Sequence, residues 1–350
     1  MVDIYDPTFR GPNPVGVRTE WYASSRPGRG VLTAEIWYPT TPDWSGVDVD
    51  EQRCDRYMLT PELGPRFQHA VRGAEGVQRN TPLVLFSHHS FGSRRESSHL
   101  MTHLASHGYV VAAIDHTGNT LVDRLRQSPP DANAKDVRIQ IREITERRSE
   151  DVLELADHLL SGDDERGVGV VGHSWGGYTA LEVTARDSRV NCVCAMTPGG
   201  SRTHLATDCL REWLVVDWDR PVPTLVFASE FDSQIPCEGV VGLYERLSEP
   251  KRLCILDNCD HVHYVDRVAA EHEGMRQMLE SLPAKASDVA RTLELIRPIA
   301  SLRDPEEALV AVRALSLAHL DAELRSNEDA RRWLGTQAHQ MEAVKELLLN

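Results

Sequence analysis

The residues best suited to covalent chemistry lie in the middle of the chain, in the stretch Gly172-His173-Ser174-Trp175-Gly176. A β-branched run precedes this stretch and a helical pattern follows it, which predicts the strand, tight turn and helix of a nucleophile elbow. In such a turn the serine hydroxyl stands clear of the sheet, and flanking glycines let the strand and the helix cross closely. The short pattern alone also occurs in ordinary glycine-rich turns. The context favours the elbow, so Ser174 is the candidate nucleophile.

Polar loops follow the strands that the hydrophobic pattern predicts. These strands are expected at residues 82–88, 109–115, 190–196, 223–230 and 252–256. The loop after the first strand contains His89, Ser90 and Phe91, where backbone N–H groups can face a developing oxyanion. Asn119 follows the second strand, and open α/β sheets place their sites at the carboxyl ends of strands. We therefore expect His89, His173 and Asn119 to line a substrate pocket there.

The alternation of strands and helices predicts an α/β fold with a mostly parallel sheet. We expect a catalytic domain over residues 1–283, in which residues 43–80 and 117–136 are excursions that line the pocket. A helix is predicted near residues 65–74 in the first excursion. Residues 284–350 are predicted to be a helical extension without strands, with one helix starting at Asp304-Pro305 and a second over 328–348. This extension either packs on the domain or forms a homodimer contact.

Charge and composition narrow the classes of partner. The 350 residues carry 38 Lys and Arg against 53 Asp and Glu, a formal charge of −15, which disfavours nucleic acid and anionic membranes as partners. The sequence has no apolar run of membrane-spanning length and no signal-peptide pattern at its start, so a cytoplasmic protein is expected.

Metal and cofactor sites are not expected. The seven cysteines are scattered without paired C-x-x-C spacing, which predicts reduced, mostly buried thiols. His99, His103 and His107 recur every four residues on a predicted helix, as metal ligands can. Leu100 and Leu104 anchor the same helix in the core, and a solvent-side histidine stripe is the commoner case. We therefore expect no bound metal or cofactor.

Three stretches resemble a known family: Phe86-Ser87-His88, the run from Leu104 to Ala113, and the motif from Gly172 to Gly177. They are similar to α/β-hydrolases, and within that superfamily to the serine esterases that include platelet-activating-factor acetylhydrolases and dienelactone-hydrolase-like bacterial proteins. The similarity covers residues 1–270. It implies the α/β-hydrolase fold, a mostly parallel central sheet flanked by helices.

Three departures from these relatives limit what carries over. Dienelactone hydrolases proper use a cysteine at the elbow, whereas this chain has Ser174. The acetylhydrolases commonly take their acid from the loop after the next strand, which here reads Met196-Thr197-Pro198 and lacks a carboxylate. His89 stands where the family usually has glycine, so the oxyanion donor in that loop is left open between Ser90 and Phe91.

The acid is therefore expected one strand later. Asp232, followed by Ile235-Pro236, matches the pattern of the wider fold, with Glu230 as the alternative. The base is expected at His261, because Asp260-His261 resembles the ending that carries the family's histidine, with His263 as the competitor. The chain order Ser174, Asp232, His261 is the order of this fold.

The resemblance implies a carboxylic ester hydrolase that forms an acyl-enzyme without metal or cofactor. His261 would accept the proton of Ser174, and Asp232 would hold the imidazole in one tautomer. The backbone N–H of Trp175, with that of Ser90 or Phe91, would bind the oxyanion. The expected partner is a small-molecule ester. An amide, a lactone or a polyester as substrate, and a ligand-binding protein that has lost chemistry, stay open as alternatives.

Overall fold

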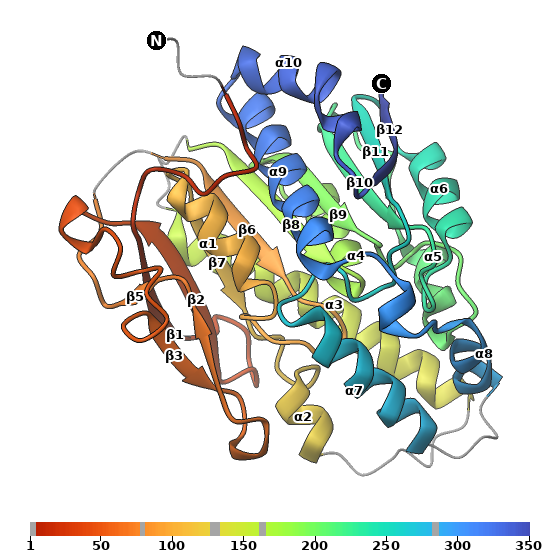
Figure 1. The fold of residues 1–350 in the computed structure, drawn as a ribbon. Coiled ribbons are helices and arrows are strands. Elements are labelled where there is room, and N and C mark those ends of the chain that lie inside the picture. Colours follow the sequence, from red (N-terminus) through yellow and green to blue (C-terminus); the bar gives the residue numbers. More distant parts are fainter. Residues whose placement is uncertain (1–4, 78–80, 127–133, 161–165, 282–286) are drawn as a thin grey trace.

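The centre of the protein is one ten-stranded sheet. A computed structural model describes residues 5–77, 81–126, 134–160, 166–281 and 287–350. The strand order is β12-β11-β10-β9-β8-β6-β7-β2-β1-β5 (Figure 1). The strands are β1 (Val15–Ala23), β2 (Val31–Pro39), β5 (Val71–Arg72), β6 (Leu83–Ser87), β7 (Val110–Ile114), β8 (Val168–His173), β9 (Val190–Met196), β10 (Thr224–Ser229), β11 (Lys251–Leu256) and β12 (Val344–Leu349).

The middle of the sheet is parallel and its two sides are mixed. Strands β6 to β11 pair only in parallel with one another, whereas β2 is antiparallel to β7 and to β1, and β12 is antiparallel to β11. The loops after β6 to β11 therefore all leave from the same edge of the sheet. That edge is where the predicted chemistry-bearing loops lie.

Helices cover both faces of the sheet and enclose two cores (Figure 1). Neighbouring residues of one strand face opposite cores: Leu85 and Val170 pack on one side, Phe86 and Val171 on the other. The first core includes α3 (Ala134–Leu159), α4 (Trp175–Arg186) and α6 (Cys237–Arg246), and the second includes α1 (Ser98–Ser106), α9 (Pro305–Leu324) and α10 (Glu328–Thr336). This confirms the predicted sheet flanked by helices.

The helix predicted near residues 65–74 is wrong. That segment forms β4 (Pro65–Gln68), which pairs with β3 (Asp55–Met58) in a separate hairpin, and β5, which joins the main sheet beside β1. Gln68 is held in this arrangement by Trp37, whose Nε1 donates to Gln68 Oε1 at 2.9 Å. Contacts with distant strands decide the conformation here, and they override a weak local pattern.

The excursion at residues 117–136 is only partly described. Its described portion contains α2 (Leu121–Arg126), and residues 127–133 lie outside the described residues.

The predicted C-terminal extension is part of the same fold. Asp304 caps α9 as expected, with Oδ1 accepting the backbone N–H of Glu306 at 2.9 Å. The helix predicted over 328–348 is wrong: α10 ends at Thr336, and the last residues form β12. Strand β12 pairs with β11, whose backbone would otherwise be an open sheet edge. The helix prediction failed because the pairing of these residues with β11 depends on a distant segment, which the local sequence pattern does not reveal.

Helix α9 lies directly against the sheet. A side chain at Gly169 in β8 would place its Cβ 2.8 Å from Leu320 Cδ2, so glycine lets the helix approach the strand closely. Ala314, Leu317 and Leu320 are fully buried. These buried residues of α9, which lies in the predicted extension, pack within the protein's own fold.

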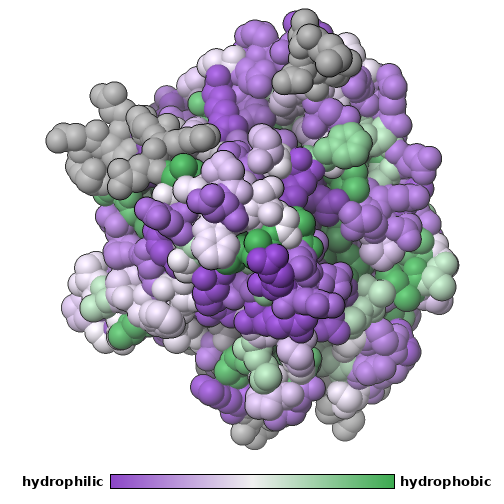
Figure 2. Space-filling model, turned by 60° about the vertical axis from the view of Figure 1, so that its left-hand side comes forward, coloured by the Kyte–Doolittle hydropathy of each residue, from purple (hydrophilic) through white to green (hydrophobic). Residues whose placement is uncertain are grey.

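The outer surface is mostly polar. Figure 2 turns the side with β1 to β5 toward the viewer and shows a largely hydrophilic face, on which hydrophobic residues form small separate patches. Within the described residues, no helix is long and apolar enough to cross a membrane. Six of the seven cysteines are buried and Cys237 is partly buried, as the sequence predicted.

Candidate active site

Ser174 occupies a strained turn between β8 and α4. Its backbone has φ 57° and ψ −119°, a region that residues other than glycine rarely adopt. The close crossing depends on two glycines. A Cβ on Gly172 would lie 2.0 Å from the carbonyl oxygen of Gly176, and one on Gly176 would lie 1.9 Å from that of Ser87. The predicted nucleophile elbow is therefore present in the structure.

Asp232 and His261 form a buried pair on the loops after β10 and β11. His261 Nδ1 lies 2.9 Å from Asp232 Oδ2 and 3.0 Å from Oδ1. Asp232 Oδ1 also accepts the backbone N–H groups of Gln234 and Ile235, at 2.9 and 2.7 Å. These contacts orient the carboxylate and leave Nε2 as the ring nitrogen that can accept a proton.

The electrostatics of the pair favour a charged imidazole. Burial by itself lowers the pKa of His261, but the Asp232 carboxylate and its hydrogen bond outweigh burial and raise this pKa above its ordinary value. Asp260 and Glu96 raise it further. A base with this environment holds a proton more readily than a free histidine does.

The two alternative residues are engaged elsewhere. Glu230 pairs with Lys345 of β12 and accepts the backbone N–H of Asn258 at 2.9 Å, so it braces the loop after β11. His263 Nδ1 lies 3.0 Å from the backbone nitrogen of Asp260, and its Nε2 lies 3.4 Å from the carbonyl oxygen of Arg303. Neither makes a contact suited to the role of acid or base beside Ser174.

The His261 ring lies beside the elbow. His173, the neighbour of Ser174, has its ring centroid 5.0 Å from that of His261 and donates from Nε2 to the carbonyl oxygen of His261 at 2.9 Å. No hydrogen bond joins Ser174 Oγ to the His261 ring, both of which are described. In unliganded enzymes such contacts are often long and tighten when substrate binds.

The two predicted donors in the loop after β6, Ser90 and Phe91, differ in whether their backbone N–H is already used. Phe91 N–H donates to the carbonyl oxygen of Asn119 at 3.1 Å, and Gly92 N–H to that of His89 at 3.1 Å. His89 N–H donates to Glu96 Oε1 at 2.8 Å. Among the described residues, Ser90 N–H has no acceptor. Phe91 is therefore the weaker of the two predicted donors, because its N–H is already used.

Trp175 is the other predicted donor. It is the first residue of α4, and the N–H groups of a helix's first turn have no acceptor within the helix. An oxyanion near Ser174 would also lie at the positive end of this helix.

Two of the three predicted pocket residues are buried and line neither of the two described hollows. His173 is 0 % exposed, like the rest of the buried strand β8 that it ends. Asn119 is 1 % exposed, and its Oδ1 accepts from Arg148 at 2.6 Å. These two expectations are corrected. His89 is partly exposed, and its Nδ1 lies 2.6 Å from the carbonyl oxygen of Ser90.

Three buried charged residues that the sequence interpretation missed support the site. Arg148 of α3 contacts the carbonyl oxygen of His88, and Glu96 contacts the backbone of His89. Asp260 Oδ1 accepts the N–H groups of His261 and Ser233, at 2.6 and 2.7 Å, and so joins the loops after β10 and β11. The sequence holds one signal for Arg148. It lies four residues before Val152, so it places a charge on the apolar face of the predicted helix.

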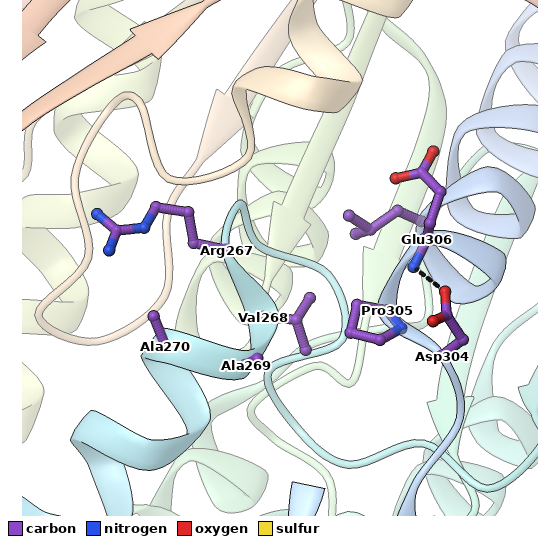
Figure 3. Close-up of a pocket in the computed structure, with 8 residues that line it drawn as sticks. Arg267, Val268, Ala269, Ala270, Asp304, Pro305 and Glu306 are labelled. Atoms are coloured by element: carbon purple, nitrogen blue, oxygen red, sulfur yellow. Dashed lines mark hydrogen bonds between the residues drawn. The ribbon is translucent and has the colours of Figure 1, made fainter. Parts of the chain in front are cut away.

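Ser174 lines neither of the two described surface hollows. The larger, with a volume of about 500 Å³, lies between the starts of α7 (Val268–Ser281) and α9, and in Figure 3 Arg267 points away from the capping residue Asp304. The smaller, about 280 Å³, is lined partly by Phe231, Asp232 and residues of α8 (Ser287–Leu295). The candidate active site is therefore located by its residues and their contacts, and the volume of a hollow does not identify it.

The described residues contain no group of three or more His, Cys, Asp or Glu that could hold a metal ion. The predicted solvent-side histidine stripe on α1 is wrong. His103 is buried, and His99 Nε2 lies 2.9 Å from the carbonyl oxygen of Tyr264. These histidines pack between elements.

Comparison with known proteins agrees with this geometry. The family model "PET hydrolase-like" matches residues 89–278. Platelet-activating factor acetylhydrolase of Cavia porcellus is 26% identical over 251 residues, covering 61% of this chain and 54% of the relative. The protein of that name from Canis lupus familiaris is 26% identical over 210 residues, covering 46% and 45%. The chain thus spans about half the length of these two relatives.

A solved structure shows the same fold. Ferulic acid esterase from Streptomyces cinnamoneus superimposes with a TM-score of 0.62 at 22% identity, covering 93% of both chains. Together the matches confirm the resemblance to α/β-hydrolases that the sequence motifs indicated.

Proposed function

The chain belongs to the PET hydrolase-like family, and from this premise we propose that it is a serine hydrolase that cleaves carboxylic esters through an acyl-enzyme. The observation that carries the proposal is the buried pair of His261 and Asp232, with Nδ1 and Oδ2 2.9 Å apart, beside the strained turn of Ser174. A nucleophile, a base and an orienting acid are the minimum set for this chemistry.

In the proposed reaction, Ser174 Oγ attacks the ester carbonyl carbon while His261 Nε2 takes its proton. The tetrahedral oxyanion accepts hydrogen bonds from the N–H groups of Trp175 and Ser90. Collapse expels the alcohol, which takes the proton from His261 and leaves the acyl group on Ser174. Water, deprotonated by His261, then attacks the acyl-enzyme; the bond to Ser174 Oγ breaks, His261 returns the proton to Oγ, and the acid is released.

The proposed substrate is a small-molecule ester. Both acetylhydrolase relatives are named for removal of an acetyl group, so we infer that a short acyl chain is the first to test. Purified protein is assayed against p-nitrophenyl esters from acetate to decanoate. The control is Ser174→Ala, which keeps the fold's turn and removes only the hydroxyl.

Hydrolysis by the wild type and its loss in Ser174→Ala support the proposal. Equal turnover by the two proteins would contradict it. Mass spectrometry after reaction with a fluorophosphonate adds a second readout, because the reagent should add to Ser174 alone. Binding of an ester without turnover or labelling would favour the ligand-binding alternative, and turnover of an amide, lactone or polyester but no small ester would favour those substrates.

A further inference from the structure

We propose that Glu96 and Arg148 clamp the peptide unit between His88 and His89, and that this clamp positions the neighbouring Ser90 N–H to bind the oxyanion. The inference rests on the proposed esterase function. In this role Glu96 and Arg148 are positioning residues that act through the loop backbone.

The carboxylate holds one end of the peptide unit. Glu96 Oε1 accepts the N–H of His89 at 2.8 Å, and Oε2 lies 3.3 Å from Nε2 of the same histidine. The loop has space for this carboxylate because residue 92 is glycine: a Cβ on Gly92 would lie 1.8 Å from Glu96 Oε2. The turn is thus shaped around the carboxylate.

The guanidinium holds the other end. Arg148 is fully buried and donates from Nη2 to the carbonyl oxygen of His88. It also donates from Nη1 to Asn119 Oδ1 at 2.6 Å, and the Asn119 carbonyl oxygen accepts the N–H of Phe91. Arg148 therefore restrains the loop before and after Ser90, directly and through Asn119.

Opposite charges on the two ends of one amide fix its plane. A cation at C=O and an anion at N–H both favour the same orientation of the peptide dipole, and charged partners make stronger hydrogen bonds than neutral ones. The next N–H along the chain is that of Ser90, which has no acceptor within the described residues. Its direction depends on the plane of the preceding peptide, so a loosened clamp would misalign it.

Glu96 also faces the elbow. Its Oε1 lies 3.8 Å from His173 Nδ1, and its charge raises the pKa of His261. The titratable and charged groups that interact with this carboxylate are His89, His173, His261 and Arg148. Burial raises the pKa of Glu96 to about 7, against the lowering effects of His89 and its backbone N–H and of Arg148. Removal of the charge should therefore change the pH dependence of catalysis as well as its rate.

Glu96→Ala and Glu96→Gln in the full chain test the proposal. Glutamine can still accept from His89 N–H, whereas alanine cannot. We expect Glu96→Ala to lower kcat on p-nitrophenyl acetate about 10- to 100-fold, somewhat less than loss of an oxyanion donor, with KM little changed. Glu96→Gln should retain kcat within about 3-fold and move the acidic limb of kcat/KM to lower pH, because the charge that raises the pKa of His261 is gone.

The matched control is Asp321→Asn. Asp321 is another buried carboxylate, on α9, and it accepts from the hydroxyls of Tyr5 and Tyr109 at 2.9 and 2.8 Å, far along the chain from the loop. This control should keep kcat and the pH profile. Unchanged kcat in Glu96→Ala, or an equal loss in Glu96→Gln, would overturn the proposal.

Amide hydrogen exchange separates this proposal from the esterase proposal. The His89 amide should exchange slowly in the wild type and in Glu96→Gln, and faster in Glu96→Ala. Equal exchange in all three would refute the clamp even if esters are hydrolysed. If the wild type neither hydrolyses esters nor reacts with a fluorophosphonate, the esterase proposal fails, while the exchange rates still decide whether the clamp exists.

Discussion

His173 donates a hydrogen bond from Nε2 to the backbone carbonyl of His261, at 2.9 Å. Together with the contact between the two rings, this hydrogen bond joins the turn that carries Ser174 to the loop that carries the proposed base. Because His173 is fully buried, water does not compete for the bond. The distance between nucleophile and base is thus set partly by a side chain that cannot touch the substrate.

Replacement of His173 should therefore impair catalysis without changing substrate binding. We expect His173→Ala to lower kcat about 10-fold or more, because small misplacements of catalytic groups are costly, and to leave KM within about 3-fold. His173→Gln should recover part of the loss, since its amide nitrogen can reach the same carbonyl oxygen. Steady-state kinetics on p-nitrophenyl acetate measure both values. A large rise in KM with unchanged kcat would instead indicate a direct role in binding.

The pH dependence of kcat/KM should report His261. The raised pKa means that the neutral base forms above pH 6.5, so activity should rise with pH through a midpoint above that value. Asp232→Asn removes the main group that raises this pKa. We expect it to lower kcat at pH 8 about 10³- to 10⁴-fold and to move the midpoint of the residual activity to lower pH.

Glu230→Gln is the control for this substitution. Glu230 contacts Lys345 and the backbone of Asn258, so its replacement should change kcat less than about 3-fold. A large loss in Glu230→Gln with little loss in Asp232→Asn would transfer the role of acid to Glu230.

The same pair should contribute to stability in a pH-dependent way. The pKa of His261 is raised in the folded protein, so protonation favours folding. The stabilisation is complete below the unfolded pKa near 6.5 and is lost as pH rises through the folded pKa. The Tm difference between wild type and Asp232→Asn should therefore be about 1–3 °C larger at pH 5.5 than at pH 9. Calorimetry at both values measures it, and a larger difference at pH 9 would mean that the sign is wrong.

The elbow should not tolerate a side chain at Gly176. A Cβ there would lie 1.9 Å from the carbonyl oxygen of Ser87 and 2.7 Å from that of His88, so strand and helix must separate. We expect Gly176→Ala to lower the free energy of unfolding by about 3 kcal/mol or more.

Gly274→Ala in α7 is the matched control for Gly176→Ala. A Cβ at Gly274 meets no atom within 4 Å, and alanine favours helix over glycine. This change should leave stability unchanged or raise it by up to about 1 kcal/mol. Urea unfolding measures the free energy of unfolding of both variants. If the two changes alter it equally, the structure relieves the clash at Gly176 and the prediction is wrong.

The parts of the site that depend on local chain geometry could be predicted from the sequence. The turn at Ser174 needs glycines within a few residues, and buried strands show as apolar runs, so both leave a local pattern. The placement of Asp232 and His261 after successive strands follows from the way parallel strands present their carboxyl ends. Strand order did not separate Asp232 from Glu230 or His261 from His263, and the contact between Asp232 and His261 in the structure does.

The remaining features depend on which distant segments meet. Strand β12 forms because β11 offers an open edge, and no neighbouring residue encodes that partner. Ser90 and Phe91 are equivalent by sequence, and only the bond from Phe91 N–H to Asn119 distinguishes them. Glu96 and Arg148 contact the two ends of the peptide unit between His88 and His89, and Arg148 thereby joins α3 to the loop after β6. The sequence by itself determined the candidate nucleophile and the order of the proposed triad, because those are properties of successive residues and strands. The tertiary structure alone decided which backbone N–H is free, because hydrogen-bond partners are chosen in three dimensions.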